Sequence, residues 1–137
     1  MTSATDRTPS VRATGGCLCR AVRFEVNGEL RGVVLCHCEM CRKTHGHIAA
    51  YTAAAKSALR FIETRGLKWY RSSPTARRGF CSECGGSLVW EPSAKDYIAI
   101  AAGTLDMPTG LATTLQINLH SAGDYYDIDT RVPQRAD

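Results

Sequence analysis

The hydrophobic positions of this chain form many short runs rather than a few long ones. From Gly15 to Val26 the apolar residues fall largely on alternate positions, which predicts one strand that runs through two cysteines. Further short runs, separated by Gly, Pro or Ser turns, lie at residues 33–35, 59–62, 67–70, 78–80, 88–90, 97–101 and 115–119. Many short strands with few helices predict a mainly β domain.

Two stretches near the middle of the chain have a different pattern. Residues 39–45 are long enough for one or two helical turns, and Gly46 is placed to end them. Residues 48–55 are small and apolar, a pattern that is compatible with a strand or a helix. We expect a strand there.

The 137 residues, 44% of them hydrophobic, suit one small domain that metal ions help to stabilise. Residues 1–13 lack periodicity and are expected to form a flexible tail, which leaves residues 14–137 as the domain. No apolar run has the length of a signal-peptide core or a membrane span. An odd number of cysteines without a secretory signal indicates a reducing, cytoplasmic setting.

Cys36, Cys38 and Cys41 lie within six positions of the chain and are followed at once by Arg42 and Lys43. Because alternate residues of an extended strand share a face, the first two sulfur atoms can point to one place. The two residues before Cys41 allow a tight turn that brings the third sulfur back to the same place. This is the spacing of metal ligands.

The other four cysteines form two pairs, Cys17 with Cys19 and Cys81 with Cys84, and Gly85 then supplies a positive-φ turn. A structural zinc takes four protein ligands, whereas a catalytic zinc takes three and leaves one position open. One site of four and one of three would use all seven cysteines. The two C-x-x-C pairs could instead close one ribbon-like site, although the 39 residues between them exceed the usual gap. Spacing alone leaves both groupings open.

Zinc is the metal that these motifs favour. Neither C-x-x-C pair has the histidine of a haem-attachment motif, the βαβ setting of a redox pair or the spacing of a common iron–sulfur cluster. The formal net charge is +4. Seven thiolates would remove seven charges and two zinc ions would add four, which leaves +1. Such a charge does not indicate a nucleic-acid partner.

Four segments carry a specific resemblance to a known family. They are Gly16-Cys17-Leu18-Cys19, Cys36-His37-Cys38-Glu39-Met40-Cys41-Arg42-Lys43, Arg78-Gly79-Phe80-Cys81-Ser82-Glu83-Cys84-Gly85 and Gly103-Thr104-Leu105-Asp106. With three cysteine motifs in this order, the chain resembles the glutathione-dependent formaldehyde-activating enzyme family, to which centromere protein V is similar. The resemblance extends from about residue 15 to residue 133.

The resemblance implies an Mss4-like β-tent of short antiparallel strands with few helical turns and two zinc ions per chain. It assigns the catalytic zinc to Cys36, Cys38 and Cys41, and so favours the grouping of four and three over the ribbon. The structural zinc falls to Cys17, Cys19, Cys81 and Cys84. Arg42, directly after the last catalytic ligand, is a candidate for binding substrate carboxylates or stabilising the anionic zinc centre.

The activity that the resemblance implies is that of a carbon–sulfur lyase similar to S-(hydroxymethyl)glutathione synthase. In that reaction a zinc-bound thiolate, from a small thiol such as glutathione, adds to formaldehyde or a similar small aldehyde. His37, His45 and His47 are candidates for the proton donor, because imidazole titrates near neutral pH. Three residues depart from the family pattern: Arg20 stands where Gly is frequent, Gln116 where His is expected, and Ala122 where a basic residue is frequent.

The alternative is a non-catalytic module, stabilised by zinc, that binds a thiol or another protein. A vacant fourth ligand position at the second zinc distinguishes the two hypotheses. In a purely structural protein, His37 or His45 would fill that position.

Overall fold

The computed structural model describes residues 11–135. Residues 1–10, which belong to the expected N-terminal tail, lie outside the described residues. The strands are β1 (Ala13–Gly16), β2 (Arg23–Val26), β3 (Val33–Cys36), β4 (Ala49–Ala55), β5 (Leu59–Glu63), β6 (Leu67–Ser73), β7 (Ala76–Cys81), β8 (Ser87–Pro92), β9 (Tyr97–Ala101) and β10 (Thr113–Ile117). The helical elements are α1 (Glu39–His45) and three 3-10 turns, η1 (Lys56–Ala58), η2 (Ala102–Thr104) and η3 (Leu119–Ser121).

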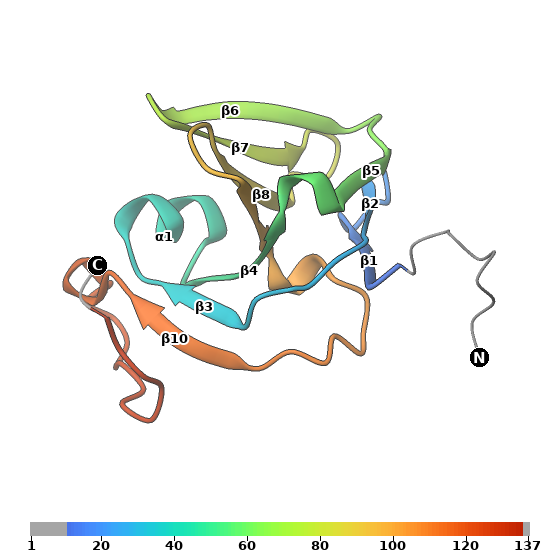
Figure 1. Ribbon diagram of the computed structural model, residues 1–137. Coiled ribbons are helices and arrows are strands. Elements are labelled where there is room, and N and C mark those ends of the chain that lie inside the picture. The colour runs from blue at the N-terminus through green and yellow to red at the C-terminus, as the bar shows by residue number, and fades with distance from the viewer. Residues whose placement is uncertain (1–10, 136–137) are drawn as a thin grey trace, which may run out of the picture.

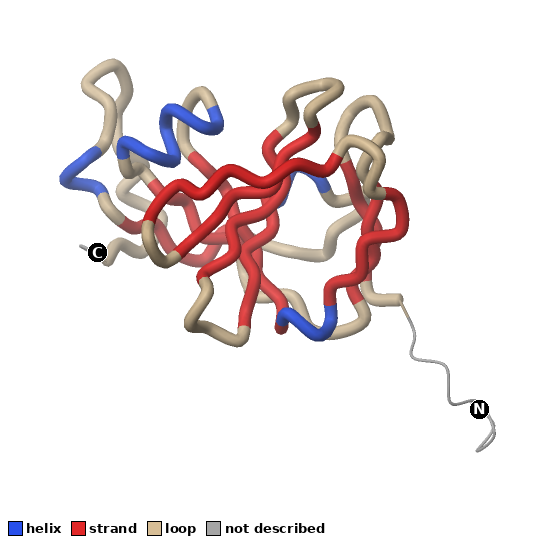
Figure 2. The backbone as a smooth tube through the Cα atoms, turned by 90° about the horizontal axis from the view of Figure 1, so that it is seen from above, coloured by secondary structure: helices blue, strands red, loops and turns tan. Residues whose placement is uncertain are grey.

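The strands form two sheets (Figure 1). Seven strands make the larger sheet in the order β10-β3-β4-β9-β8-β7-β6, and the smaller sheet has the order β1-β2-β5. Neighbouring strands are antiparallel except for β10 and β3, which are parallel. The strands make up the body of the molecule and the short helical segments lie around them (Figure 2). The prediction of a mainly β fold built from short antiparallel strands is confirmed.

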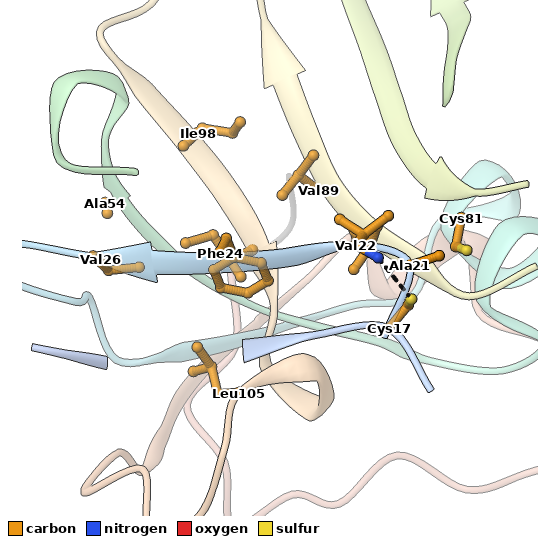
Figure 3. Close-up of a cluster of buried hydrophobic side chains, with 12 residues drawn as sticks. Cys17, Ala21, Val22, Phe24, Val26, Ala54, Cys81, Val89, Ile98 and Leu105 are labelled. Atoms are coloured by element: carbon orange, nitrogen blue, oxygen red, sulfur yellow. Dashed lines mark hydrogen bonds between the residues drawn. The ribbon is translucent and has the colours of Figure 1, made fainter. Parts of the chain in front are cut away.

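The main hydrophobic core joins the two sheets. Phe24 and Val26 of β2 pack in one cluster with Val89 of β8 and Ile98 of β9, and all four side chains are buried (Figure 3). Burial of a side chain of this size contributes about 1.5–3 kcal/mol. Cys81 belongs to the same cluster, so one candidate metal ligand is anchored directly in the core.

The predicted single strand from Gly15 to Val26 is wrong. The chain instead forms a hairpin in which β1 pairs with β2, and residues 17–22 make the turn between them. The Cys17 N–H closes this turn on the Val22 carbonyl at 3.1 Å, and Arg20 takes a left-handed conformation with φ of 70°. The alternating pattern misled because both arms of the hairpin contribute alternate residues to the buried side.

The helix predicted over residues 39–45 is confirmed as α1. It begins after Cys38, whose sulfur accepts a hydrogen bond from the Cys41 N–H at 3.3 Å and thereby caps the first turn. It ends at Gly46, where φ is 82° and the N–H donates to the Arg42 carbonyl at 2.8 Å. The cap places two cysteines in a fixed relation at the start of the helix.

The strand predicted over residues 48–55 is confirmed as β4. It lies between β3 and β9, with Ala49 opposite Cys36 and Tyr51 opposite Val34. At the edge of the sheet, β10 ends earlier than predicted because Asn118 adopts φ of 58° and starts a 3-10 turn. Between residues 11 and 135, no helix combines the length and hydrophobicity needed to cross a membrane.

Candidate metal centres

Cys17, Cys19, Cys81 and Cys84 form a four-cysteine cluster, in which all sulfur atoms lie within 4.8 Å of one another. The first two come from the β1–β2 turn, and the last two come from the end of β7 and the turn after it. The Cys19 sulfur lies 3.7 Å from those of both Cys17 and Cys81. Gly85, with φ of 80°, completes the second turn as the sequence predicted. The cluster therefore ties the hairpin of the small sheet to the large sheet.

Backbone N–H groups point at the sulfur atoms of this cluster. The Val22 N–H donates to the Cys17 sulfur at 3.3 Å, and the N–H groups of Glu83 and Cys84 donate to the Cys81 sulfur at 3.4 Å. Backbone N–H groups also lower the pKa of the Cys84 thiol to about 6. Donors arranged in this way stabilise thiolates rather than thiols. The residues thus fit a four-thiolate metal site.

Cys36, Cys38 and Cys41 form a three-cysteine cluster, again with all sulfur atoms within 4.8 Å of one another. Cys36 ends β3, Cys38 caps α1 and Cys41 lies in its first turn. Two polar side chains approach the cluster, one from β7 and one from the residue that follows β10. The Asn118 amide donates to the Cys36 sulfur at 3.3 Å, and the Arg78 guanidinium donates to the Cys41 sulfur at 3.8 Å.

The thiols of the three-cysteine cluster cannot all ionise easily without a cation between them. A hydrogen bond from the Cys41 thiol lowers the pKa of Cys36 to about 5, whereas the same contact and burial raise the pKa of Cys41. Like charges at this separation oppose each other, and a metal ion removes that repulsion. The donor set and its crowding therefore fit a metal ion.

The two clusters differ in the number of protein ligands that they offer to a metal ion. Within residues 11–135, no His, Asp, Glu or further Cys offers a fourth ligand atom to the three-cysteine cluster. The three-cysteine cluster instead lines a cavity of about 450 Å³. Four ligands close a structural zinc site, and three leave a position for an exogenous ligand.

The cavity is positively charged and partly aromatic. Among the described residues that line it are Arg31, Arg78 and Arg135, together with Trp90 and Tyr97, but no Asp or Glu. Burial lowers the pKa of Arg31, whose guanidinium donates to the Tyr51 carbonyl at 3.2 Å. Cations that line one cavity without carboxylates favour an anionic ligand.

A hydrogen-bonded chain runs from the three-cysteine cluster through Arg78 and Tyr51 to His45. The Arg78 Nη1 donates to the Tyr51 hydroxyl at 3.1 Å, and that hydroxyl lies 2.7 Å from the His45 Nε2. Burial lowers the pKa of His45 to about 4, with a smaller contribution from the Arg78 charge. Burial raises the pKa of Tyr51. At neutral pH the imidazole is therefore uncharged and the tyrosine hydroxyl keeps its proton.

The other candidate histidines are also engaged away from the cysteines. His37 is 1% exposed, with its Nε2 2.9 Å from the Gln116 Oε1 and its Nδ1 2.7 Å from the Tyr126 hydroxyl. The amide oxygen only accepts, so a neutral His37 carries its proton on Nε2. His47 contacts the Tyr125 hydroxyl at 2.8 Å. Gln116, which stands where the family pattern has His, thus fixes the orientation of His37.

The two cations after Cys41 do not face the cavity. Arg42 and Lys43 are absent from the described residues that line it. Arg42 is half-buried with its Nε unpartnered, and Lys43 pairs with Glu39 at 3.7 Å on the exposed face of α1. The arginine that contacts a cluster sulfur is Arg78.

Sequence reasoning missed most of the residues around the three-cysteine cluster. Arg78 belongs to the segment Arg78-Gly79-Phe80-Cys81, which carried the resemblance, but the pattern gave no reason to place it beside Cys41. Tyr51 and Asn118 reach the cluster only because β4 and β10 flank β3 in the sheet. Such pairings join residues far apart in sequence, and no local motif marks them.

Comparisons with known proteins agree with this architecture. The model of the family described as glutathione-dependent formaldehyde-activating enzyme matches residues 12–121. An uncharacterized lyase of Schizosaccharomyces pombe is 33% identical over 115 residues, which cover 82% of each chain. The crystal structure of a Rhodobacter sphaeroides protein is similar with a TM-score of 0.59 at 25% identity, covering 89% of this chain and 99% of that one. This protein therefore belongs to the glutathione-dependent formaldehyde-activating enzyme family.

Proposed function

We propose that this protein is a zinc-dependent carbon–sulfur lyase of the S-(hydroxymethyl)glutathione synthase type. It adds the sulfur of a small thiol such as glutathione to formaldehyde or a similar small aldehyde, and it cleaves the same bond in reverse. The observation that carries the proposal is the three-cysteine cluster, which faces a charged cavity and lacks a fourth ligand among the described residues. Family membership and the lyase name of the fungal relative support this reaction class.

In this proposal the four-cysteine cluster holds a structural zinc, and the three-cysteine cluster holds a second one. A zinc ion bound by Cys36, Cys38 and Cys41 would keep the sulfur of an incoming thiol deprotonated at neutral pH. Asn118 and Arg78 donate hydrogen bonds to two of the cysteine sulfurs and so fix their orientation. A cytoplasmic location follows from the need for reduced thiols.

The cavity supplies binding and orientation. Arg31 lines it beside Trp90 and Tyr97, so it offers positive charge to the carboxylates of a thiol and apolar surface to its carbon chain. Arg42 remains a proposed catalytic residue because it follows Cys41 directly. Its Arg42→Ala variant tests this role, with a loss of rate expected if the guanidinium reaches the substrate when it binds.

Exchange spectroscopy with ¹³C-formaldehyde and glutathione tests the proposal. Thiols add to formaldehyde without help, so the useful quantity is the exchange rate between hydrated formaldehyde and the hydroxymethyl thiol. We expect protein at a small fraction of the substrate concentration to raise this rate in proportion to its amount. Cys38→Ser, which removes one ligand of the three-cysteine cluster, should abolish the increase, and the exposed Ser82→Ala should not.

Two results would count against the proposal. An exchange rate that stays at the uncatalysed value with several thiols would exclude the lyase. A change in populations that follows the amount of protein, without faster exchange, would identify a thiol-binding module instead.

A further inference from the structure

Arg78 of β7 is a buried cation that lacks a carboxylate partner. It is 7% exposed, and among residues 11–135 it forms no ion pair with Asp or Glu. Five arginines that are more exposed do form such pairs, namely Arg23, Arg60, Arg65, Arg77 and Arg131. A buried charge without a counter-charge is strongly unfavourable. Arg78 therefore requires a negative group of another kind beside it.

The Cys41 sulfur is the group that can carry this negative charge. The Arg78 Nη2 donates to it at 3.8 Å, Nη1 donates to the Tyr51 hydroxyl at 3.1 Å, and the buried Nε has no partner among the described residues. Burial raises the pKa of Tyr51, so its hydroxyl stays neutral. A metal ion in the three-cysteine cluster would hold the Cys41 sulfur as a thiolate, which places an anion beside the guanidinium.

Burial decides which of the two cysteine clusters needs such a cation. In the four-cysteine cluster Cys19 and Cys84 are exposed, so water can solvate the negative charge of a closed zinc site. Between residues 11 and 135, the hydrogen-bond donors to its sulfur atoms include no Lys or Arg side chain. In the three-cysteine cluster Cys36 and Cys41 are buried and Cys38 is half-buried. Less water reaches these sulfur atoms, so the protein itself has to offset their charge.

We propose that Arg78 is the counter-charge of the metal centre in the three-cysteine cluster and acts on it through the Cys41 sulfur. The inference rests on the second zinc of the proposed function, but not on the lyase reaction. Asn118 also donates to a sulfur of this cluster, that of Cys36, but its amide is neutral. Within the described part of the chain, Arg78 is therefore the one charged side chain that donates to these sulfur atoms. It is a positioning residue, because it reaches the metal only through a ligand.

The counter-charge gives the open ligand position a preference for anions. A zinc ion with three thiolates has one net negative charge, and a fourth thiolate adds a second. Arg78 offsets one of these charges, whereas a neutral fourth ligand such as imidazole adds none. Attraction between charges is stronger in a buried site than in water, so Arg78 stabilises the thiolate-bound state more than the imidazole-bound state. The preferred ligands are then thiolates, the class of ligand that the proposed reaction uses.

The first test measures this preference in the cobalt-loaded full-length protein. The thiol 2-mercaptoethanol and imidazole are titrated separately while the absorption of the ion in the three-cysteine cluster is recorded. This thiol has no carboxylate, so the cavity arginines do not attract it through one. We expect Arg78→Met to shift the ratio of the two dissociation constants against the thiol by at least about 10-fold. An unchanged ratio overturns the inference.

Arg77→Met is the matched control for this titration. It removes the same charge from the neighbouring residue of β7, whose guanidinium pairs with Glu91 at 2.7 Å and does not contact the cluster. We expect its ratio of dissociation constants to stay within about 2-fold of wild type, because exposed charges are screened by water. An equal shift in Arg77→Met and Arg78→Met would show an effect of net charge alone and would contradict the role of Arg78.

The thiolate-to-cobalt charge-transfer band supplies a readout that a purely structural role would not move. A cation beside a sulfur lowers the energy of its lone pairs and so raises the energy of the transition. We expect Arg78→Met to move the band of this ion to longer wavelength, and Arg78→Lys, which keeps the charge, to retain most of the wild-type position and ligand preference. If Arg78→Met does not fold, a soluble Arg78→Lys protein without the preference contradicts the inference.

The outcomes separate this inference from the proposed function. If the wild-type protein prefers the thiol but does not accelerate formaldehyde exchange, the lyase proposal fails and the counter-charge stands. If the wild-type protein accelerates exchange and Arg78→Met keeps the wild-type ratio and band position, the counter-charge fails and the lyase proposal stands. Uptake of a single cobalt ion by the wild type overturns both.

Discussion

Replacing Cys84 by Ser separates a metal ligand from an ordinary surface side chain. Cys84 is exposed, and its sulfur lies within 4.8 Å of those of Cys17, Cys19 and Cys81. Serine has nearly the same shape but binds zinc poorly. The substitution therefore removes little packing and one ligand.

The two interpretations of Cys84 predict very different losses of folding stability. As an exposed side chain without a metal, its replacement should change stability by no more than about 0.5 kcal/mol. As a ligand of a structural zinc, it contributes to a folding free energy of about 10–16 kcal/mol for such sites. A small domain has only about 5–15 kcal/mol of stability in total. The cluster also joins the β1–β2 turn to the end of β7, so its loss removes one of the links between the two sheets.

We expect Cys84→Ser to be insoluble or to lack native circular dichroism. Far-ultraviolet circular dichroism and urea unfolding, each with and without a chelator, measure this against the wild type. Ser82→Ala is the matched control in the same turn, and chelator should lower the stability of this control and of the wild type alike. A soluble Cys84→Ser protein with the native spectrum and the wild-type urea midpoint would refute the assignment of a structural metal.

Three further predictions concern stability. Arg20→Gly should stabilise the protein by roughly 0.5–1 kcal/mol in urea unfolding. The left-handed conformation at φ of 70° costs an L-residue about 1–2 kcal/mol, which glycine avoids, but glycine also loses more backbone entropy on folding, which offsets part of the gain. A lower urea midpoint would contradict this prediction. Hydrogen bonds from Arg23, aided by Thr14, lower the pKa of Asp106 to about 2, so its contribution is present above its unfolded pKa near 3.8 and is lost as pH falls from about 4 to about 2. Asp106→Asn should remove that pH dependence, with an effect below about 1 kcal/mol because the pair is solvent-screened, and an unchanged acid profile would refute it. Gly66→Ala should cost about 1–3 kcal/mol, since a Cβ there would lie 2.6 Å from the buried Cys81 sulfur; wild-type thermal stability would contradict this prediction.

The sequence predicted the elements whose signals are local. The helix over residues 39–45 was predictable because the cysteine spacing, the length of the run and Gly46 all act within a few residues. The strand over residues 48–55 was predictable from its apolar run and its neighbours. The β1–β2 hairpin was missed because alternation does not show where a strand turns back, and the left-handed Arg20 carries no signal in its residue type.

The residues around the three-cysteine cluster could not be predicted from the sequence, for a different reason. Arg78 and Tyr51 meet only after β7, β8, β9 and β4 have paired side by side, which brings residues 27 positions apart into contact. The cysteines can be identified as candidate ligands by their chemistry and spacing. An arginine or a tyrosine is common on any strand and carries no such signal. Pairing order in the sheet, which local patterns do not determine, decided which of the arginines became part of the cavity.

The most direct measurement replaces zinc with cobalt and then titrates glutathione while the thiolate charge-transfer and d–d absorption bands are recorded. The intensity and position of these bands report ligand number and geometry at each ion. We predict two cobalt ions per chain and a saturable change confined to one of them, the ion in the three-cysteine cluster. Two spectroscopically closed sites, both indifferent to glutathione and to other small thiols, would contradict the account of one structural and one open metal centre.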